Sequence, residues 1–304
     1  MEPAISVKNL AKQYGQMPVI RDISFDVPTG SVFAFLGTNG AGKSTTINCI
    51  VTTLQPTSGE IYVLGKKIGK DDAVIKQNIG VVFQSSILDP LLTVRENIKI
   101  RGSFYTGGVN FEDRIKELID LIDMDEFIDR RYGMLSGGQK RRADIARALY
   151  HNPSILFLDE PTTGLDPKSR ETVWQLIREL QKKQGKTVFL TTHYMEETEN
   201  ADNVVIIDKG TIVSTGTPQQ LRSKYSQNIL RLEAKDPDKL STRLSRQKIF
   251  YKIVEGGVFV VHPPSSESAL DILHSIKSDI IDFEFRHGNM DDVFLKLAEG
   301  ADRL

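Results

Sequence analysis

The sequence predicts an α/β fold in which a buried, mostly parallel sheet is joined to an antiparallel layer and followed by a small α+β domain. Three observations lead to this prediction. Apolar and polar residues alternate through the first 30 positions, as in half-buried antiparallel strands. Helix-forming stretches with a 3.6-residue apolar period separate the later strands. Those later strands are short, nearly continuous apolar runs, typical of parallel strands buried on both faces: "SVFAFLG", "ILFLDE", "TVFLTTH" and "VVIID".

The antiparallel layer is expected from two alternating runs near the start of the chain. Ile5 and Val7 share one face of the first run, and Ile23, Phe25 and Val27 share one face of the second. Because side chains alternate along a strand, each run buries one face and leaves the other in water.

The clearest helix of the α/β part is "SRETVWQLIRELQKK". Asp166 and Pro167 supply an N-cap followed by a proline in the first helical turn. The apolar positions follow the i, i+3, i+4, i+7 pattern of an amphipathic helix and are Val173, Leu176, Ile177 and Leu180.

Between about residues 85 and 150 the strand signal disappears, which predicts an inserted helical subdomain. Asn110 is placed to cap an amphipathic helix in this region. The apolar face of that helix contains Ile115, Leu118, Ile119 and Ile122.

The polar stretch "SKYSQN" at 223–228 predicts a boundary between an α/β domain, residues 1–225, and a C-terminal domain, residues 226–304. The second domain reads strand, helix, hairpin, helix, strand, with the hairpin turning at Gly256 and Gly257. This β-α-β-β-α-β order is that of a ferredoxin-like domain. A strand in which Ile281, Phe283 and Phe285 alternate with polar residues precedes a last helix around residues 293–297.

Composition excludes several classes of protein. The 304 residues contain no apolar run near the ~18 needed to cross a bilayer. The start of the chain lacks a secretory signal, and the single Cys49 permits no intrachain disulfide, so we expect a reducing cytoplasm. A net charge of −1 predicts no nucleic-acid partner. The basic run Lys140, Arg141 and Arg142 is expected to form an exposed helix face.

The stretch "GTNGAGKST" matches the phosphate-binding P-loop and lies between a predicted buried strand and a helix. Glycines are needed because backbone amides wrap the phosphates. Lys43 would neutralise phosphate charge, and the Ser44 hydroxyl would ligate Mg²⁺. The residues expected to bind the nucleotide here are Gly37, Asn39, Gly40, Ala41, Gly42, Lys43, Ser44 and Thr45.

The run "ILFLDEP" ends a buried strand in two adjacent carboxylates, at the edge of the sheet where open α/β proteins bind ligands. Successive side chains of a strand point in opposite directions, so Asp159 and Glu160 are expected to do different work. Asp159 suits the Mg²⁺ shell, and Glu160 suits orienting and deprotonating an attacking water.

A second anion-binding helix start occurs at "LSGGQ". Ser136 and Gln139 have the spacing of a capping box, while Gly137 and Gly138 leave the first backbone amides accessible to a ligand. If this end gripped the nucleotide of its own P-loop, the same phosphate would be enclosed twice. We therefore expect it to serve a neighbouring chain.

Taken together, these motifs resemble the nucleotide-binding subunit of an ATP-binding cassette (ABC) transporter over about residues 5–220. The resemblance also includes Tyr14 in "KQYG", Gln84 in "VVFQ", "GLD" at 164–166 and His193 in "TTH". It implies that Tyr14 stacks on adenine, that Gln84 touches Mg²⁺ and senses the transporter, that Asp166 lies at a subunit interface, and that His193 holds the γ-phosphate.

The resemblance implies ATP and Mg²⁺ as cofactors and a second nucleotide-binding subunit, either an identical chain or a close paralogue. Glu160, His193, Lys43 and Gln84 would then carry the hydrolysis. Because this chain has no predicted membrane span, transmembrane permease subunits are expected as separate partners. The chain would then be cytoplasmic and peripheral on the inner face of the cell membrane.

The C-terminal domain, with its ending "GNMDDVFLKLAEG", resembles the accessory domain of drug-exporter-type ATPase subunits. That favours an exporter, although an inert dimerisation or regulatory module fits the same residues. Apolar residues beside Gln84 form a candidate dock for a permease or cap the helical subdomain's own core; they are Ile87, Leu88, Leu91 and Leu92.

Two other functions are weighed against the exporter ATPase. A soluble ABC-type ATPase acting on ribosomes or DNA would ordinarily join two cassettes or insert long coiled coils, and neither feature occurs in this sequence. A P-loop kinase acting on small molecules leaves "LSGGQ" unexplained. The sequence leaves the transported substrate and the identity of the second subunit open.

Overall fold

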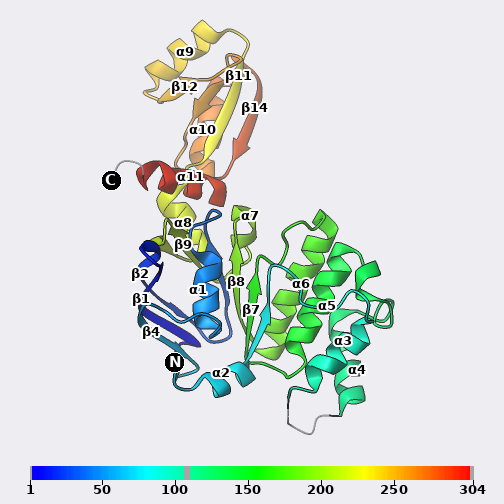
Figure 1. Ribbon diagram of the computed structural model, residues 1–304. Coiled ribbons are helices and arrows are strands. Elements are labelled where there is room, and N and C mark those ends of the chain that lie inside the picture. Colours follow the sequence, from blue (N-terminus) through cyan, green and yellow to red (C-terminus); the bar gives the residue numbers. More distant parts are fainter. Residues whose placement is uncertain (1, 106–109, 302–304) are drawn as a thin grey trace. The chain divides into compact units, whose positions relative to one another are not determined.

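The computed structural model describes residues 2–105 and 110–301 (Figure 1). The chain divides into two compact units, the first ending at Thr217 and the second beginning at Pro218. Each unit has its own hydrophobic core.

The first unit begins with a four-stranded antiparallel sheet in the order β2-β1-β4-β5. Its strands are β1 (Ile5–Tyr14), β2 (Met17–Val27), β4 (Ser58–Val63) and β5 (Lys66–Lys67). The predicted alternation is confirmed, because Ile5, Val7, Ile23 and Val27 are buried in one core.

The main sheet has six strands in the order β10-β9-β3-β8-β7-β6. All neighbours are parallel except the β9–β10 pair. The strands are β3 (Val32–Leu36), β6 (Ile79–Val82), β7 (Ile155–Asp159), β8 (Thr187–Thr192), β9 (Asn203–Asp208) and β10 (Thr211–Gly216). The uninterrupted apolar runs of β3 and β7 are fully buried, as their sequence predicts.

An aromatic cluster joins the two sheets. Phe25 of β2 lies with its ring centroid 5.7 Å from Phe33 and 5.3 Å from Phe35 of β3. Phe189 of β8 extends the cluster toward Phe157 of β7. Stacked and tilted ring pairs at these distances are favourable, and they fix the antiparallel layer against the parallel sheet.

Helices connect the strands and cover the sheet (Figure 1). Helix α6 starts where the sequence predicts, with Asp166 as N-cap accepting a hydrogen bond from the Ser169 amide at 3.0 Å. Outside the helical subdomain, the described helices of this unit are α1 (Lys43–Ile50), α2 (Asp72–Asn78), α6 (Pro167–Gln184) and α7 (Met195–Thr198).

Within residues 94–105 and 110–149 the structure has helices and no strand, in agreement with the expected helical subdomain. Its elements are α3 (Val94–Gly102), α4 (Phe111–Ile122), a 3₁₀ turn (Tyr132–Met134) and α5 (Gly137–Leu149). Asn110 caps α4 as predicted, and its side chain accepts from the Glu112 amide at 2.9 Å.

The prediction that Lys140, Arg141 and Arg142 form an exposed helix face is wrong. Arg141 is buried, and its guanidinium donates 2.9 Å to the carbonyl of Phe83. Arg142 donates 2.7 Å to the carbonyl of Asp123 at the end of α4. Helix α5 packs against α3, α4, α6 and β6, so little of its surface is left for water. Its arginine side chains bind backbone carbonyls instead.

The second unit is a four-stranded antiparallel sheet in the order β12-β13-β11-β14. Its elements are α8 (Pro218–Tyr225), β11 (Ile229–Ala234), α9 (Pro237–Arg246), β12 (Tyr251–Ile253), β13 (Phe259–Val261), α10 (Ser266–Ile276), β14 (Ile280–Arg286) and α11 (Met290–Ala301). Gly256 and Gly257 both have positive φ in the β12–β13 turn, as expected for this hairpin.

Two details of this unit differ from the sequence expectation. Ile281 and Phe283 are more than half exposed on the edge strand β14, whereas Ile280 and Phe285 of the same strand pack against the core. The compact unit also includes α8, which precedes the predicted boundary after residue 225, because α8 packs against α11; the domain division itself stays a prediction.

The first unit contains a half-buried histidine that supplies a test of its stability. His151 packs flat on Tyr105, with centroids 4.1 Å apart, and burial lowers the pKa of its imidazole to about 4. The unfolded chain takes up a proton near the ordinary value of 6.5, so unfolding is increasingly favoured as pH falls from 6.5 to 4. Between pH 6.5 and pH 4 we expect the free energy of unfolding of His151→Gln to fall by about 2 kcal/mol less than that of the unaltered chain.

Urea denaturation at pH 7 and pH 4.5 measures this difference. The control is His274→Gln, because His274 is exposed on α10. Equal pH dependence for His151→Gln and the unaltered chain would show that this imidazole is not held neutral by folding.

Candidate functional site

The P-loop is a tight turn between β3 and α1. Gly42 precedes α1 with φ +108°, a backbone conformation that residues with a Cβ rarely adopt. A Cβ on Gly37 would lie 2.5 Å from the carbonyl oxygen of Ile207 in β9. Glycine is therefore required both for the turn and for the close approach of the loop to the neighbouring strand.

Lys43 folds back over this loop. Its Nζ donates to the carbonyls of Gly37 at 2.8 Å and Thr38 at 3.2 Å, and the residue is only 4% exposed. The same ammonium lies 3.3 Å from a carboxylate oxygen of Glu160. The lysine thus joins the P-loop to the end of β7.

Four segments converge on the Glu160 carboxylate. Besides Lys43, His193 Nδ1 lies 3.2 Å from Oε2, Gln84 Nε2 donates to Oε2 at 3.3 Å, and Thr163 Oγ1 donates to Oε2 at 3.2 Å. The four residues associated with hydrolysis by resemblance, Lys43, Gln84, Glu160 and His193, are therefore brought together in one chain.

The backbone at Glu160 explains why its side chain points away from that of Asp159. Glu160 has φ +47°, so the chain leaves the strand at this residue. Its amide donates 3.0 Å to Thr191 Oγ1 of β8. A non-glycine residue in this left-handed region is strained, and such strain is concentrated at functional sites.

The charge of Glu160 is set by opposing effects. Burial raises the pKa of its carboxyl, but the nearby charges of Lys43 and His193 lower it more, so the resulting pKa is below the ordinary value of 4.5. The carboxylate is therefore ionised at neutral pH and can accept a proton from a bound water.

Asp159 faces the start of α1. Its Oδ1 accepts from Thr191 Oγ1 at 2.5 Å and from Ser44 Oγ at 3.4 Å. The two acidic residues at the end of β7 thus lie in different surroundings. Asp159 is beside Ser44, and Glu160 is beside Lys43.

The start of α5 forms the predicted capping box. Ser136 Oγ accepts from the Gln139 amide at 3.3 Å, and the Gln139 side chain accepts from the Ser136 amide at 3.1 Å. A Cβ on Gly138 would lie 2.5 Å from Ser169 Oγ, so α5 and α6 start side by side. Within residues 2–105 and 110–301, no hydrogen bond or ion pair connects this end with Lys43 or Glu160.

Comparison with known proteins places this arrangement in a family. The ABC transporter family profile matches residues 20–163. The Nod factor export ATP-binding protein I of Rhizobium meliloti (strain 1021) is 37% identical over 299 residues, covering 97% of this chain and 88% of the relative. The chain belongs to the ATP-binding proteins of ABC transporters. It is an ATPase whose hydrolysis of ATP drives transport.

Two further similarities support the assignment of this ABC ATPase. The daunorubicin/doxorubicin resistance ATP-binding protein of Streptomyces peucetius is 34% identical over 310 residues, covering 97% of this chain and 92% of the relative. A dimeric ATP-binding cassette solved in a post-hydrolysis state with ADP and Pi matches with a TM-score of 0.64 and 32% identity. It covers 70% of this chain and 98% of its own.

The described residues of the ABC ATPase contain no helix that is both long and apolar enough to span a bilayer.

Tyr14 and the tip of the P-loop are open to solvent. Tyr14 is half exposed at the end of β1, with Lys12 Nζ 5.3 Å from its ring centroid. Asn39 and Gly40 are exposed, whereas Ala41 is buried and Thr45 half-buried.

Sequence reasoning missed the role of Arg141 in this site. Its guanidinium donates to the backbone carbonyls of Phe83 and Glu160, at 2.9 and 3.3 Å. It therefore ties α5 to the segment before Gln84 and to the end of β7. No local pattern identifies this contact, because a basic residue in a run of three normally lies in water.

Sequence reasoning also missed Glu197, which is buried in α7. Its carboxylate accepts hydrogen bonds from the hydroxyls of Thr162 and Thr192. Thr162 belongs to the segment leading to Asp166, and Thr192 immediately precedes His193. Glu197 thus fixes two loops of the ABC ATPase relative to each other. In the sequence it stands in "YMEETEN", which resembles a solvated acidic face.

We expect Glu197→Ala to lower the free energy of unfolding by about 3 kcal/mol, because two buried hydroxyls lose their acceptor. ATP turnover should fall as well, since the loop carrying His193 loses its anchor. Denaturant titration and a phosphate-release assay measure the two effects.

Glu196→Ala is the matched control. The Glu196 side chain is 68% exposed and pairs with Arg170 at the surface, so its loss should cost less than about 1 kcal/mol. Similar losses for the two variants would contradict the anchoring role of Glu197.

Proposed function

We propose that this chain is the nucleotide-binding subunit of an exporter, that it dimerises around two ATP molecules, and that it powers a separate membrane permease. The observation that carries the proposal is the convergence of Lys43, Gln84 and His193 on the ionised carboxylate of Glu160, beside the P-loop. This arrangement has the parts required to bind a triphosphate and to activate water against it.

Nucleotide binding rests mainly on the P-loop. Its backbone amides would surround the phosphates, with Gly37, Asn39, Gly40, Ala41, Gly42 and Thr45 forming the cradle. Lys43 would exchange its contacts with the loop carbonyls for the β- and γ-phosphates. The half-exposed ring of Tyr14 has a free face on which adenine can stack.

Magnesium fits the donor set beside the loop. Ser44 Oγ and Asp159 Oδ1 lie 3.4 Å apart, and Gln84 adds an amide oxygen from the neighbouring segment. Mg²⁺ prefers such oxygen ligands and usually keeps only one or two carboxylates besides substrate phosphates. When bound, it would neutralise charge that develops on the transferred phosphoryl group.

Hydrolysis would begin with Glu160 accepting a proton from the attacking water. His193, which contacts the same carboxylate, would hold the γ-phosphate. Gln84 would couple the presence of nucleotide in the site to the permease. Because the pKa of Glu160 lies below its ordinary value, the base is available throughout the neutral range.

The start of α5 would close over the nucleotide of a second chain. Its free amides at Gly137 and Gly138 form an anion site, completed by Ser136 and Gln139. Asp166 at the neighbouring start of α6 would lie in the same subunit interface. The similarity to a cassette solved as a dimer supports this arrangement. Loss of the γ-phosphate would then release the two chains.

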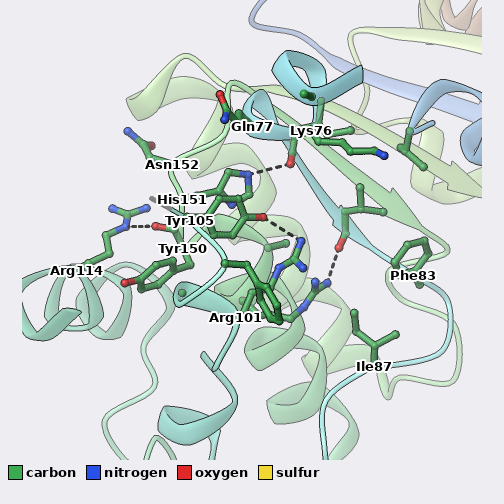
Figure 2. A pocket seen from close by; sticks show the side chains of 18 of the residues that line it. Lys76, Gln77, Phe83, Ile87, Arg101, Tyr105, Arg114, Tyr150, His151 and Asn152 are labelled. Atoms are coloured by element: carbon green, nitrogen blue, oxygen red, sulfur yellow. Dashed lines mark hydrogen bonds between the residues drawn. The ribbon is translucent and has the colours of Figure 1, made fainter. Parts of the chain in front are cut away.

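The permease would dock beside Gln84. Leu88 is buried and Leu92 half-buried, but Ile87 and Leu91 are 59% and 74% exposed. Ile87 borders a cavity of about 980 Å³ that also reaches Phe83 (Figure 2). Docking here would place the chain on the inner face of the cell membrane. The export direction is supported by the names of the relatives, one a Nod factor export protein.

The C-terminal unit would be a ferredoxin-like accessory domain, residues 226–304, following the ATPase domain of residues 1–225. The strand order β12-β13-β11-β14, with α9 and α10 as connections, supports this fold type. Relatives that cover 97% of this chain include the unit in their alignment, which favours a role in the same exporters.

Replacing Glu160 with Gln tests the hydrolysis site. We expect Glu160→Gln to bind ATP, to hydrolyse it at least about 100-fold more slowly, and to accumulate as a nucleotide-bound dimer. The amide keeps the shape of the side chain but cannot accept the proton. Phosphate release and size-exclusion chromatography with ATP measure the two outcomes.

Glu171→Gln, an exposed position on α6, is the control for the loss of one negative charge. Hydrolysis by Glu160→Gln at a rate close to that of the unaltered chain would contradict the base role.

A further inference from the structure

The ring of His193 has few polar contacts to fix its direction. Its Nδ1 lies 3.2 Å from Oε2 of Glu160, but this buried nitrogen has no partner in hydrogen-bond geometry within residues 2–105 and 110–301. A side chain that is to hold a phosphate during hydrolysis needs a defined orientation, because small displacements of a reacting group cost much of the rate. The orientation of this imidazole therefore has to come from packing.

Tyr194 supplies that packing. Its ring centroid lies 4.0 Å from that of His193, with an angle of 40° between the two planes. The ring is half-buried, and its hydroxyl makes no hydrogen bond with another described residue. The tyrosine thus contacts the imidazole through its ring and does not use its hydroxyl.

Arg170 of α6 lies over the ring of Tyr194. Its guanidinium carbon is 4.9 Å from the ring centroid, which is a cation–π contact. The arginine side chain is 28% exposed, so the contact is partly shielded from water and stronger than at an open surface. The Nε of Arg170 is buried and has no hydrogen-bond partner among the described residues. The aromatic ring is therefore a main determinant of where this guanidinium lies.

The one printed ion pair of Arg170 is a weaker restraint. A terminal nitrogen of its guanidinium lies 2.9 Å from Oε1 of Glu196, whose side chain is 68% exposed. Ion pairs exposed to this degree contribute little. The ring of Tyr194 is then the stronger of the two partners.

The backbone of Tyr194 is fixed separately from its ring. Its amide donates to Thr192 Oγ1 at 2.9 Å, and the Thr192 hydroxyl donates to Oε2 of the buried Glu197 at 2.6 Å. The main chain is thus held from the side of β8 and α7, and the ring is held from the side of α6. Two independent restraints on one residue leave its ring a single position beside the imidazole.

We propose that Tyr194 and Arg170 are positioning residues for His193. The inference rests on the proposed function, in which His193 holds the γ-phosphate. Arg170 fixes the ring of Tyr194, and that ring fixes the imidazole beside the Glu160 carboxylate. Neither side chain belongs to the residues expected to bind the nucleotide, so their loss should slow hydrolysis without weakening the binding of ATP.

Replacing Tyr194 separates these two effects. We expect Tyr194→Leu to lower kcat by about 10-fold, because the imidazole loses its packing surface. The affinity for a non-hydrolysable ATP analogue should change by less than about 2-fold, since the P-loop is untouched. Tyr194→Phe keeps the ring and should recover most of the rate. Phosphate release at saturating ATP and equilibrium dialysis with the analogue measure the two quantities in the full chain.

Tyr62→Leu is the matched control. Tyr62 is a half-buried tyrosine of β4 with Lys67 Nζ 5.8 Å from its ring centroid, so the same kind of pair is lost away from the site. Its kcat should stay within about 2-fold of that of the unaltered chain. Thermal unfolding of each variant establishes that it is folded. A folded Tyr194→Phe as slow as Tyr194→Leu, or a Tyr194→Leu that binds the analogue weakly, would overturn the inference.

The contribution of Arg170 is measured by combining variants. Arg170→Gln should lower kcat by about 3-fold, because the ring loses its cation. Arg170→Gln together with Tyr194→Leu should be no slower than Tyr194→Leu alone, since both act through the same ring. Losses that multiply would contradict the role given to Arg170.

Combination with His193→Ala tests whether the tyrosine acts through the histidine. In that background Tyr194→Leu should cause no further loss of kcat, because no imidazole is left to position. A further loss of about 10-fold there would overturn the inference. If His193→Ala alone hydrolyses ATP as fast as the unaltered chain, the proposed role of His193 fails, and the inference with it. If His193→Ala is slow but folded Tyr194→Leu is not, only the inference fails.

Discussion

The site depends on the contacts that the buried carboxylate of Glu160 makes with its neighbours. A charged group this close to the core needs hydrogen-bonding or oppositely charged partners. Here those partners come from the P-loop, from the segment at Gln84, from the turn at Thr163 and from the loop after β8. The parallel sheet makes this convergence possible, because β3, β7 and β8 all end at the same edge. The strained backbone at Glu160 then turns the carboxylate toward Lys43 and leaves Asp159 beside Ser44.

The contacts around Glu160 also explain how binding elsewhere on the chain can affect the hydrolysis site. Arg141 donates hydrogen bonds to the backbone carbonyls of Phe83 and Glu160, and it belongs to the helix whose first turn is the proposed anion site. A cavity bordered by Ile87 also reaches Phe83 and Arg147 of the same helix. A permease docked beside Gln84, a nucleotide in the P-loop and a second chain at the start of α5 would therefore act on one connected set of residues.

Features encoded within a few neighbouring residues could be predicted from the sequence. The P-loop turn, the capping box at Ser136, the N-caps at Asp166 and Asn110, and the glycine hairpin of the second unit all satisfy backbone groups locally. Features that depend on burial could not. Arg141 and Glu197 look like solvated residues until packing of α5 and α7 removes them from water, and β14 looks half-buried until its edge position is known.

The central claim is that each nucleotide is held by the P-loop of one chain and the start of α5 of another. Two variants test it most directly, Lys43→Ala and Ser136→Arg, each in a Glu160→Gln background that retains bound ATP. Alone, neither variant can build a complete site. A mixed dimer has one complete site, so mixing the chains should restore one retained nucleotide per mixed dimer. If the mixture retains no more ATP than the separate variants, the shared site is contradicted.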